Sequence, residues 1–137
     1  MGKELTLGTC LDGRPHAITA EKMIAFERVI WHRVANVHSD PQEAKRVGMS
    51  RMIASGQNQL AFLHQLLHAH FQEGWNHGGR IRVRWTCPVY VGDVITPKAT
   101  VTKIAMDGGR TLVELDICCT NQSEATTAVG TARVYLT

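Results

Sequence analysis

Residues 55–71 read SGQNQLAFLHQLLHAHF, and this stretch predicts the central helix of the fold. Apolar residues recur every three or four positions on one stripe: Leu60, Leu63, Leu67 and Phe71, with Phe62 and Leu66 beside them. A stripe of this width is typical of a helix packed against a sheet. We expect the helix to begin near Ser55 and to end at Phe71 or Gln72.

Strands follow this helix, after a glycine-rich break at residues 74–79 that turns the chain. The first strand begins at Arg80, and further strands are expected at about 94–104, 110–120 and 125–136. Asp107-Gly108-Gly109 predicts a tight hairpin, and residues 121–124 a polar connection. The pattern favours an α+β class, an antiparallel sheet wrapped around one long helix.

Two shorter helices are predicted before it. Thr19 can cap a helix from Ala20 to about His32, with Ile24, Ala25, Val29 and Ile30 as its apolar face. Asp40, Pro41 and Glu43 form the pattern of a capped short helix.

The composition is that of an ordinary globular chain, with 137 residues, 44% hydrophobic and 20% charged. We expect one domain, residues 1–137. The net charge is +3, and the basic residues are scattered along the chain, which argues against nucleic acid as a partner. No stretch approaches the roughly 20 apolar residues of a membrane span, and no segment resembles a targeting signal. A cytoplasmic protein with reduced cysteines is expected.

Arg80, Arg82 and Arg84 alternate with apolar residues, so they lie on one face of the predicted strand. Two interpretations stay open. The arginines form a solvated face, or they line a groove for an anionic group such as a phosphate.

His38 is the candidate general base, because a loop imidazole titrates near cellular pH. Asn36 precedes it, and Asp40 follows it with a structural role already available as the helix cap. The alternative for His38 is that it only holds the loop.

Ser55 and Gly56 open the long helix, where backbone N–H groups lack partners within the helix. Such groups stabilise an oxygen that gains negative charge. We expect the Gly56 N–H to bind substrate, with Ser55 or Asn58 nearby. Ser55 can also be a simple N-cap, which is compatible with that role.

His64 and His68 share a helix face at a spacing that can hold zinc. The glutamate of a zinc-protease motif is missing, and no further ligand is evident. We therefore expect no metal and no other cofactor.

The pattern Asn36-x-His38-x-Asp40, the Ser55-Gly56 helix start and the segment Pro88-Val89-Tyr90-Val91-Gly92-Asp93 together resemble the MaoC-like dehydratase and (R)-specific enoyl-CoA hydratase family. The resemblance covers roughly residues 18 to 105. It implies a hotdog fold and a homodimer joined through the sheets. It also implies a 2-enoyl/3-hydroxyacyl thioester of coenzyme A or acyl carrier protein as substrate, with His38 and Asn36 catalytic.

One departure from the family pattern concerns an aspartate about five residues before the histidine. The corresponding positions here are Arg33, Val34 and Ala35, none of them acidic. This leaves an alternative open, a member that does not hydrate: a thioester-binding partner subunit, or an isomerase or cyclase using the same pocket.

Overall fold

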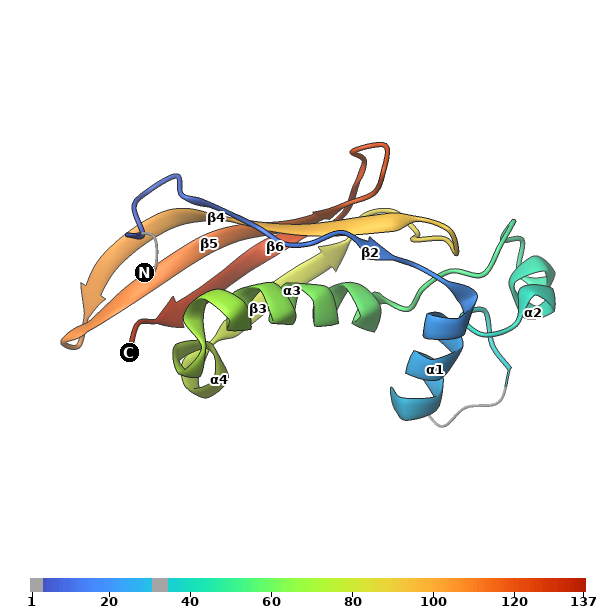
Figure 1. Ribbon diagram of the computed structural model, residues 1–137, viewed down its shortest axis with the longest axis horizontal. Coiled ribbons are helices and arrows are strands. Elements are labelled where there is room, and N and C mark those ends of the chain that lie inside the picture. Colours follow the sequence, from blue (N-terminus) through green and yellow to red (C-terminus); the bar gives the residue numbers. More distant parts are fainter. Residues whose placement is uncertain (1–3, 31–34) are drawn as a thin grey trace.

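The long helix α3, Gly56–Phe71, runs along one face of an antiparallel sheet in the computed structural model, which describes residues 4–30 and 35–137 (Figure 1). The order across the sheet is β1 (Cys10–Asp12), β4 (Val94–Asp107), β5 (Arg110–Thr120), β6 (Thr126–Tyr135) and β3 (Arg80–Trp85). The two-residue strand β2 (His16–Ala17) also pairs with β4. The predicted antiparallel sheet around one helix is confirmed.

The core lies between α3 and the inner face of the sheet. Leu63 and Leu67 of α3 are fully buried, as are residues that alternate along the three longest strands: Ile95, Val101, Val113, Leu115 and Val134. Each such side chain stabilises the fold by about 1.5–3 kcal/mol through removal of apolar surface from water. The predicted apolar stripe therefore holds the helix to the sheet.

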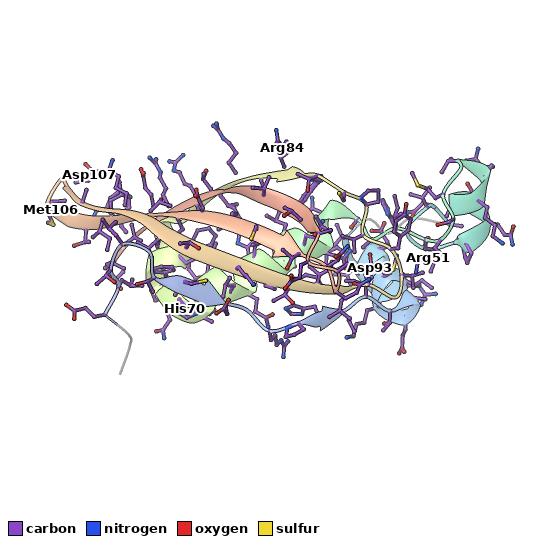
Figure 2. All side chains as sticks on the ribbon, turned by 90° about the horizontal axis from the view of Figure 1, so that it is seen from above. Arg51, His70, Arg84, Asp93, Met106 and Asp107 are labelled. Atoms are coloured by element: carbon purple, nitrogen blue, oxygen red, sulfur yellow. The ribbon has the colours of Figure 1, made fainter. Side chains whose placement is uncertain are left out.

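A tight turn at Gly108 and Gly109 closes the hairpin between β4 and β5, as predicted. Both glycines have positive φ, 56° and 79°, a conformation that side chains with a Cβ disfavour. Figure 2 shows this hairpin, with Met106 and Asp107, at one end of the sheet and Asp93 with Arg51 at the other.

Asp93 stabilises the turn that follows β3. Its carboxylate accepts the Tyr90 backbone N–H at 2.8 Å and the Gln122 side-chain amide at 2.9 Å. Tyr90 forms an isolated bridge with Ile53, just before α3. The turn after β3 is thereby tied to the start of the central helix.

The helix α1 spans Ala20–Ile30, and Thr19 caps it by accepting the Lys22 N–H at 3.2 Å. The predicted buried face is wrong, because Val29 is 72% exposed and Ile30 44%. Met23 and Glu27 are buried instead. The expected end near His32 lies outside the described residues.

The short helix α2, Pro41–Arg46, has Asp40 as its N-cap, whose carboxylate accepts the Gln42 N–H at 2.9 Å. The structural role predicted for Asp40 is confirmed. Glu43 does not complete the capping box and pairs with Arg46 at 2.9 Å.

The glycine-rich break contains a further helix, α4 (Glu73–Gly78), where the sequence predicted only a turn. Trp75 anchors it in the core, with 6% of its surface exposed. Within residues 4–30 and 35–137, no helix is both long and apolar enough to cross a membrane.

Candidate active site

A cavity of about 290 Å³ opens at the start of α3. This end of α3 is the one nearest α1 in the ribbon (Figure 1). Its walls come from α1, the loop before α2, the first turn of α3 and the end of β3. The residues that line it are Glu27, Asn36, His38, Ser55, Gly56, Gln57 and Trp85. Four of the five site residues predicted from the sequence are therefore brought together.

His38 is held by a short contact between its Nδ1 atom and the Ile53 carbonyl oxygen, 2.7 Å away. A carbonyl oxygen only accepts hydrogen bonds, so Nδ1 carries the hydrogen. In the neutral imidazole Nε2 is then the unprotonated nitrogen. The backbone thus fixes the tautomer in which Nε2 can accept a proton.

Asn36 orders the loop around this histidine. Its Oδ1 accepts the His38 backbone N–H at 2.7 Å, and its own N–H donates to Ser39 Oγ at 3.0 Å. The Nδ2 group donates to Glu27 Oε2 at 3.2 Å. Because both ends of the amide are engaged, the geometry suits Asn36 to a positioning role.

Glu27 is a charged site residue that the sequence did not predict. Its side chain projects from α1 and is only 3% exposed. Oε2 binds Asn36, whereas Oε1 is buried and has no hydrogen-bond partner within the described part of the chain. The available signal was an acidic residue one helical turn after the buried Met23, on the same face.

The first turn of α3 contributes Ser55, Gly56 and Gln57 to the cavity wall. Ser55 occupies the N-cap position but its side chain makes no capping bond. The Gly56 and Gln57 N–H groups belong to the first turn of α3, and N–H groups in a first turn have no hydrogen-bond partner within the helix. The positive, N-terminal end of the helix dipole therefore lies at a cavity that His38 also lines.

Asn58 lies behind this wall. It is 7% exposed and does not line the cavity. Its Nδ2 donates to the Ser55 carbonyl at 3.3 Å and to Ser55 Oγ at 3.2 Å. Its predicted role as a residue near the substrate stays a prediction, and the geometry supports it only through Ser55.

Trp85 explains why residue 56 is glycine. A Cβ atom at position 56 would lie 2.5 Å from Trp85 Nε1, well inside normal contact. The indole, at the end of β3, thus packs directly on the helix start and is 44% exposed. The missing side chain accommodates the protein's own tryptophan.

A second cavity, of about 340 Å³, adjoins the first and shares His38, Gly56 and Trp85 with it. Its other walls include Ala54, Pro88 and Val89, which are mostly apolar. His38 and Trp85 therefore stand where a polar cavity meets a more apolar one. That arrangement suits a ligand with a polar reacting end and an apolar chain.

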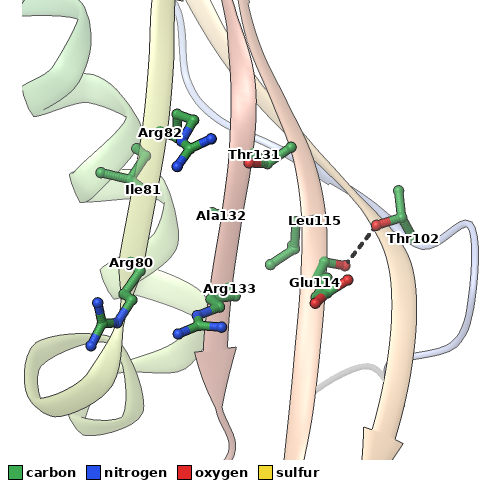
Figure 3. Close-up of a pocket in the computed structure, with 9 residues that line it drawn as sticks. All are labelled: Arg80, Ile81, Arg82, Thr102, Glu114, Leu115, Thr131, Ala132 and Arg133. Atoms are coloured by element: carbon green, nitrogen blue, oxygen red, sulfur yellow. Dashed lines mark hydrogen bonds between the residues drawn. The ribbon is translucent and has the colours of Figure 1, made fainter.

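A further hollow, of about 670 Å³, lies on the outer face of the sheet, away from α3 (Figure 3). Arg80, Arg82 and Arg133 line it, with Glu114 and Thr102 opposite. The predicted alternation is confirmed, because Ile81 and Val83 pack against the core. Of the chain that the structure describes, no carboxylate forms an ion pair with these arginines. A solvated face and a groove for an anionic group therefore both stay predictions for Arg80, Arg82 and Arg84.

The helix histidines have polar partners within the chain. His64 Nδ1 accepts the Trp75 indole N–H at 3.1 Å, and His68 Nδ1 lies 3.0 Å from Asn76 Oδ1. No group of three potential metal ligands occurs among residues 4–30 and 35–137. Burial lowers the pKa of His64 from its ordinary value, which favours the neutral ring that accepts this bond.

Residues 6–121 match the family model of the MaoC like domain. The chain belongs to this family, and its sheet and helix form the hotdog fold. A search of curated protein sequences finds no significant match.

Solved structures have the same fold at low sequence identity. The MaoC-like dehydratase from Rhodospirillum rubrum is 22% identical, with a TM-score of 0.79 over 96% of this chain and 92% of that one. The (R)-hydratase from A. caviae involved in PHA biosynthesis is 23% identical, with a TM-score of 0.78 over 99% and 100%. A 3R-hydroxyacyl-ACP dehydratase complex from Mycobacterium tuberculosis is 14% identical, with a TM-score of 0.69 over 94% and 96%.

Proposed function

We propose that this protein is a hydro-lyase that interconverts 2-enoyl and 3-hydroxyacyl thioesters. The observation that carries the proposal is one cavity with two complementary groups. His38 presents an unprotonated Nε2, fixed by the Ile53 carbonyl, and the first turn of α3 presents backbone N–H groups. Addition of water to an enoyl thioester needs both, a base for water and a donor for the enolate oxygen.

The reaction follows from these positions. In the hydration direction His38 Nε2 takes a proton from water while the water oxygen forms a bond to C3. The C2–C3 π electrons move toward the thioester carbonyl, whose oxygen gains negative charge. The imidazolium then returns its proton to C2, and the carbonyl reforms. Dehydration is the same sequence in reverse.

The start of α3 stabilises the charged oxygen. The Gly56 N–H is the proposed donor, and the dipole of the sixteen-residue helix adds to it. One donor of this kind is worth about 10²–10³ in turnover. Ser55 lines the same wall, and Asn58 holds the Ser55 hydroxyl.

The acyl carrier is coenzyme A or acyl carrier protein, and the working unit is a homodimer. The A. caviae hydratase and the M. tuberculosis acyl-carrier-protein dehydratase, both similar in fold, support this substrate class. The apolar second cavity beside His38 suits the acyl chain. A cytoplasmic location fits these substrates and stays a prediction.

The test is a steady-state assay with crotonyl-CoA and a longer enoyl-CoA. Wild-type protein should hydrate one of them, and His38→Ala should lower kcat by about 10²-fold or more. His77→Ala is the matched control, because His77 is exposed on α4 and pairs only with Glu73. The control should keep wild-type turnover, whereas full turnover in His38→Ala would remove His38 from the mechanism.

A second candidate is a partner subunit that binds the thioester without hydrating it, or an isomerase or cyclase built on the same pocket. The observation that favours it is the absence of an acidic residue at positions 33–35 of the sequence. Calorimetry with crotonyl-CoA distinguishes the two candidates. Binding without turnover in the wild type supports the partner subunit, whereas turnover excludes it.

A further inference from the structure

We propose that Glu27 is the second catalytic group of the cavity and that its free oxygen binds the water that adds to C3. The inference rests on the proposed hydro-lyase function and extends it by one residue. Among the described residues that line the cavity with His38, Glu27 is the one carboxylate.

Burying the Glu27 side chain without a full set of hydrogen bonds costs free energy. Glu27 is 3% exposed, and in the described chain its Oε1 has no hydrogen-bond partner. Buried polar atoms are almost always paired, because an unpaired one loses its hydration without replacement. Glu27 lines the cavity, and its buried, unpaired oxygen is an acceptor that a water or hydroxyl bound there would complete.

Packing alone does not require a glutamate at position 27. Glu27 follows Met23 by one turn on the buried face of α1, where an apolar side chain would pack without a charge. The bond from Asn36 uses only Oε2. The contact between α1 and the His38 loop therefore leaves one carboxylate oxygen unused.

The side-chain amide of Asn36 links Glu27 to the His38 loop. Its Oδ1 accepts the His38 N–H, which leaves Nδ2 to donate to Glu27. One amide therefore fixes the carboxylate and the loop that carries the base. Glu27 and His38 are placed relative to each other through a single intervening residue.

In the proposed step one water donates both of its hydrogens. One O–H donates to His38 Nε2 and loses its proton there as the oxygen bonds to C3. The other O–H donates to Glu27 Oε1 and stays on oxygen as the hydroxyl of the product. The imidazolium proton moves to C2, so the protonation state of Glu27 is the same before and after.

The experiment compares Glu27→Gln with the wild type. Gln keeps the volume and can still accept from Asn36, but it presents an NH₂ group where the water needs an acceptor. We expect kcat to fall by about 10²–10⁴-fold with KM within about threefold. The melting temperature should stay or rise, because a buried charge is removed.

Two further variants keep the test decisive. Glu27→Met retains the length and removes the carboxylate should Gln fold poorly, and the same loss of kcat is expected. Glu27→Asp retains the charge and should keep more turnover than either. Glu21→Gln, exposed in the first turn of α1, is the control and should match the wild type.

A folded Glu27→Gln or Glu27→Met variant with kcat within about threefold of the wild type overturns the inference and leaves the hydro-lyase function standing. A melting temperature that falls together with kcat, with turnover regained on cooling, assigns Glu27 a structural role and also overturns it. A wild type that hydrates no enoyl thioester removes the proposed function itself. These outcomes are distinguishable from one another.

Discussion

His38 Nδ1 lies 2.7 Å from the carbonyl oxygen of Ile53, and the loop is tied to the same residue a second time because the Ile53 N–H donates to the Val37 carbonyl at 3.2 Å. Ile53 in turn bridges Tyr90. The histidine is therefore positioned by the segment that leads into α3 and by the turn after β3. Its position depends on the central fold as much as on its own loop.

Replacing His38 with asparagine separates its two roles. The asparagine amide can donate to the Ile53 carbonyl in place of Nδ1, but it offers no base. We expect His38→Asn to lower kcat by about 10²-fold or more, as His38→Ala does. It should be more stable than His38→Ala in urea denaturation. Equal stability of the two variants would show that the Nδ1 contact contributes nothing to the fold.

Gly56→Ala should strain the start of α3, because the added Cβ would collide with the Trp85 ring. We expect a loss of about 1–3 kcal/mol in the free energy of unfolding, the usual cost of overpacking. Adding Trp85→Ala should recover most of it, so the double-mutant cycle should give a clear coupling energy. Additive losses in urea denaturation would contradict the contact.

Acidification should weaken the contact between β2 and α3. His16 stacks on Phe62 with ring centroids 4.0 Å apart, and burial first, then Arg14 and Lys22, lowers the pKa of His16 below its ordinary 6.5. The folded state then binds this proton less readily than the unfolded state does. Stability is therefore full above about pH 6.5 and falls as the pH drops through that value toward the lower folded pKa.

The measurement is the urea midpoint at about pH 7.5 and about pH 5. His16→Gln should show a smaller drop than the wild type between the two. His70→Gln, exposed on the same helix as Phe62, is the control and should keep the wild-type drop. An unchanged drop in His16→Gln would exclude this histidine as a source of acid sensitivity.

The assembly should be a dimer or a multiple of it. The sheet ends in two edge strands, β1 and β3, whose outer edges have no partner strand within the described residues. Such edges tend to pair with another chain. Light scattering should therefore give at least twice 15.2 kDa. A monomer at micromolar concentration would contradict the expected joining of the sheets.

The parts of the fold that could be predicted are those with strong local signals. The apolar stripe of α3 and the Gly108-Gly109 pair each indicate a local structure from a few neighbouring residues, and both predictions are confirmed. The face of α1 was predicted from its aliphatic residues, yet docking of the helix buries Met23 and Glu27. The helix α4 was missed because its glycines disfavour a helix, while the burial of Trp75 stabilises it.

The site was predictable only where its residues are close in sequence or sit at a helix end. His38, Ser55 and Gly56 carry such signals and do line one cavity, although their roles stay predictions. Glu27 and Trp85 reach the cavity from α1 and from β3. The family pattern has its carboxylate in the loop just before the histidine, whereas the carboxylate beside Asn36 in this chain comes from the preceding helix.

The Ile53–Tyr90 bridge and the packing of Trp85 on Gly56 determine when the cavity can form during folding. Both contacts join segments far apart in the chain, and long-range contacts form late because the intervening chain must first be ordered. Helix α3 and the β4–β5 hairpin can form from local contacts, but the cavity requires β3 in place. A newly made chain is therefore expected to form this local secondary structure before the cavity, and the proposed turnover should appear only once β3 is in place.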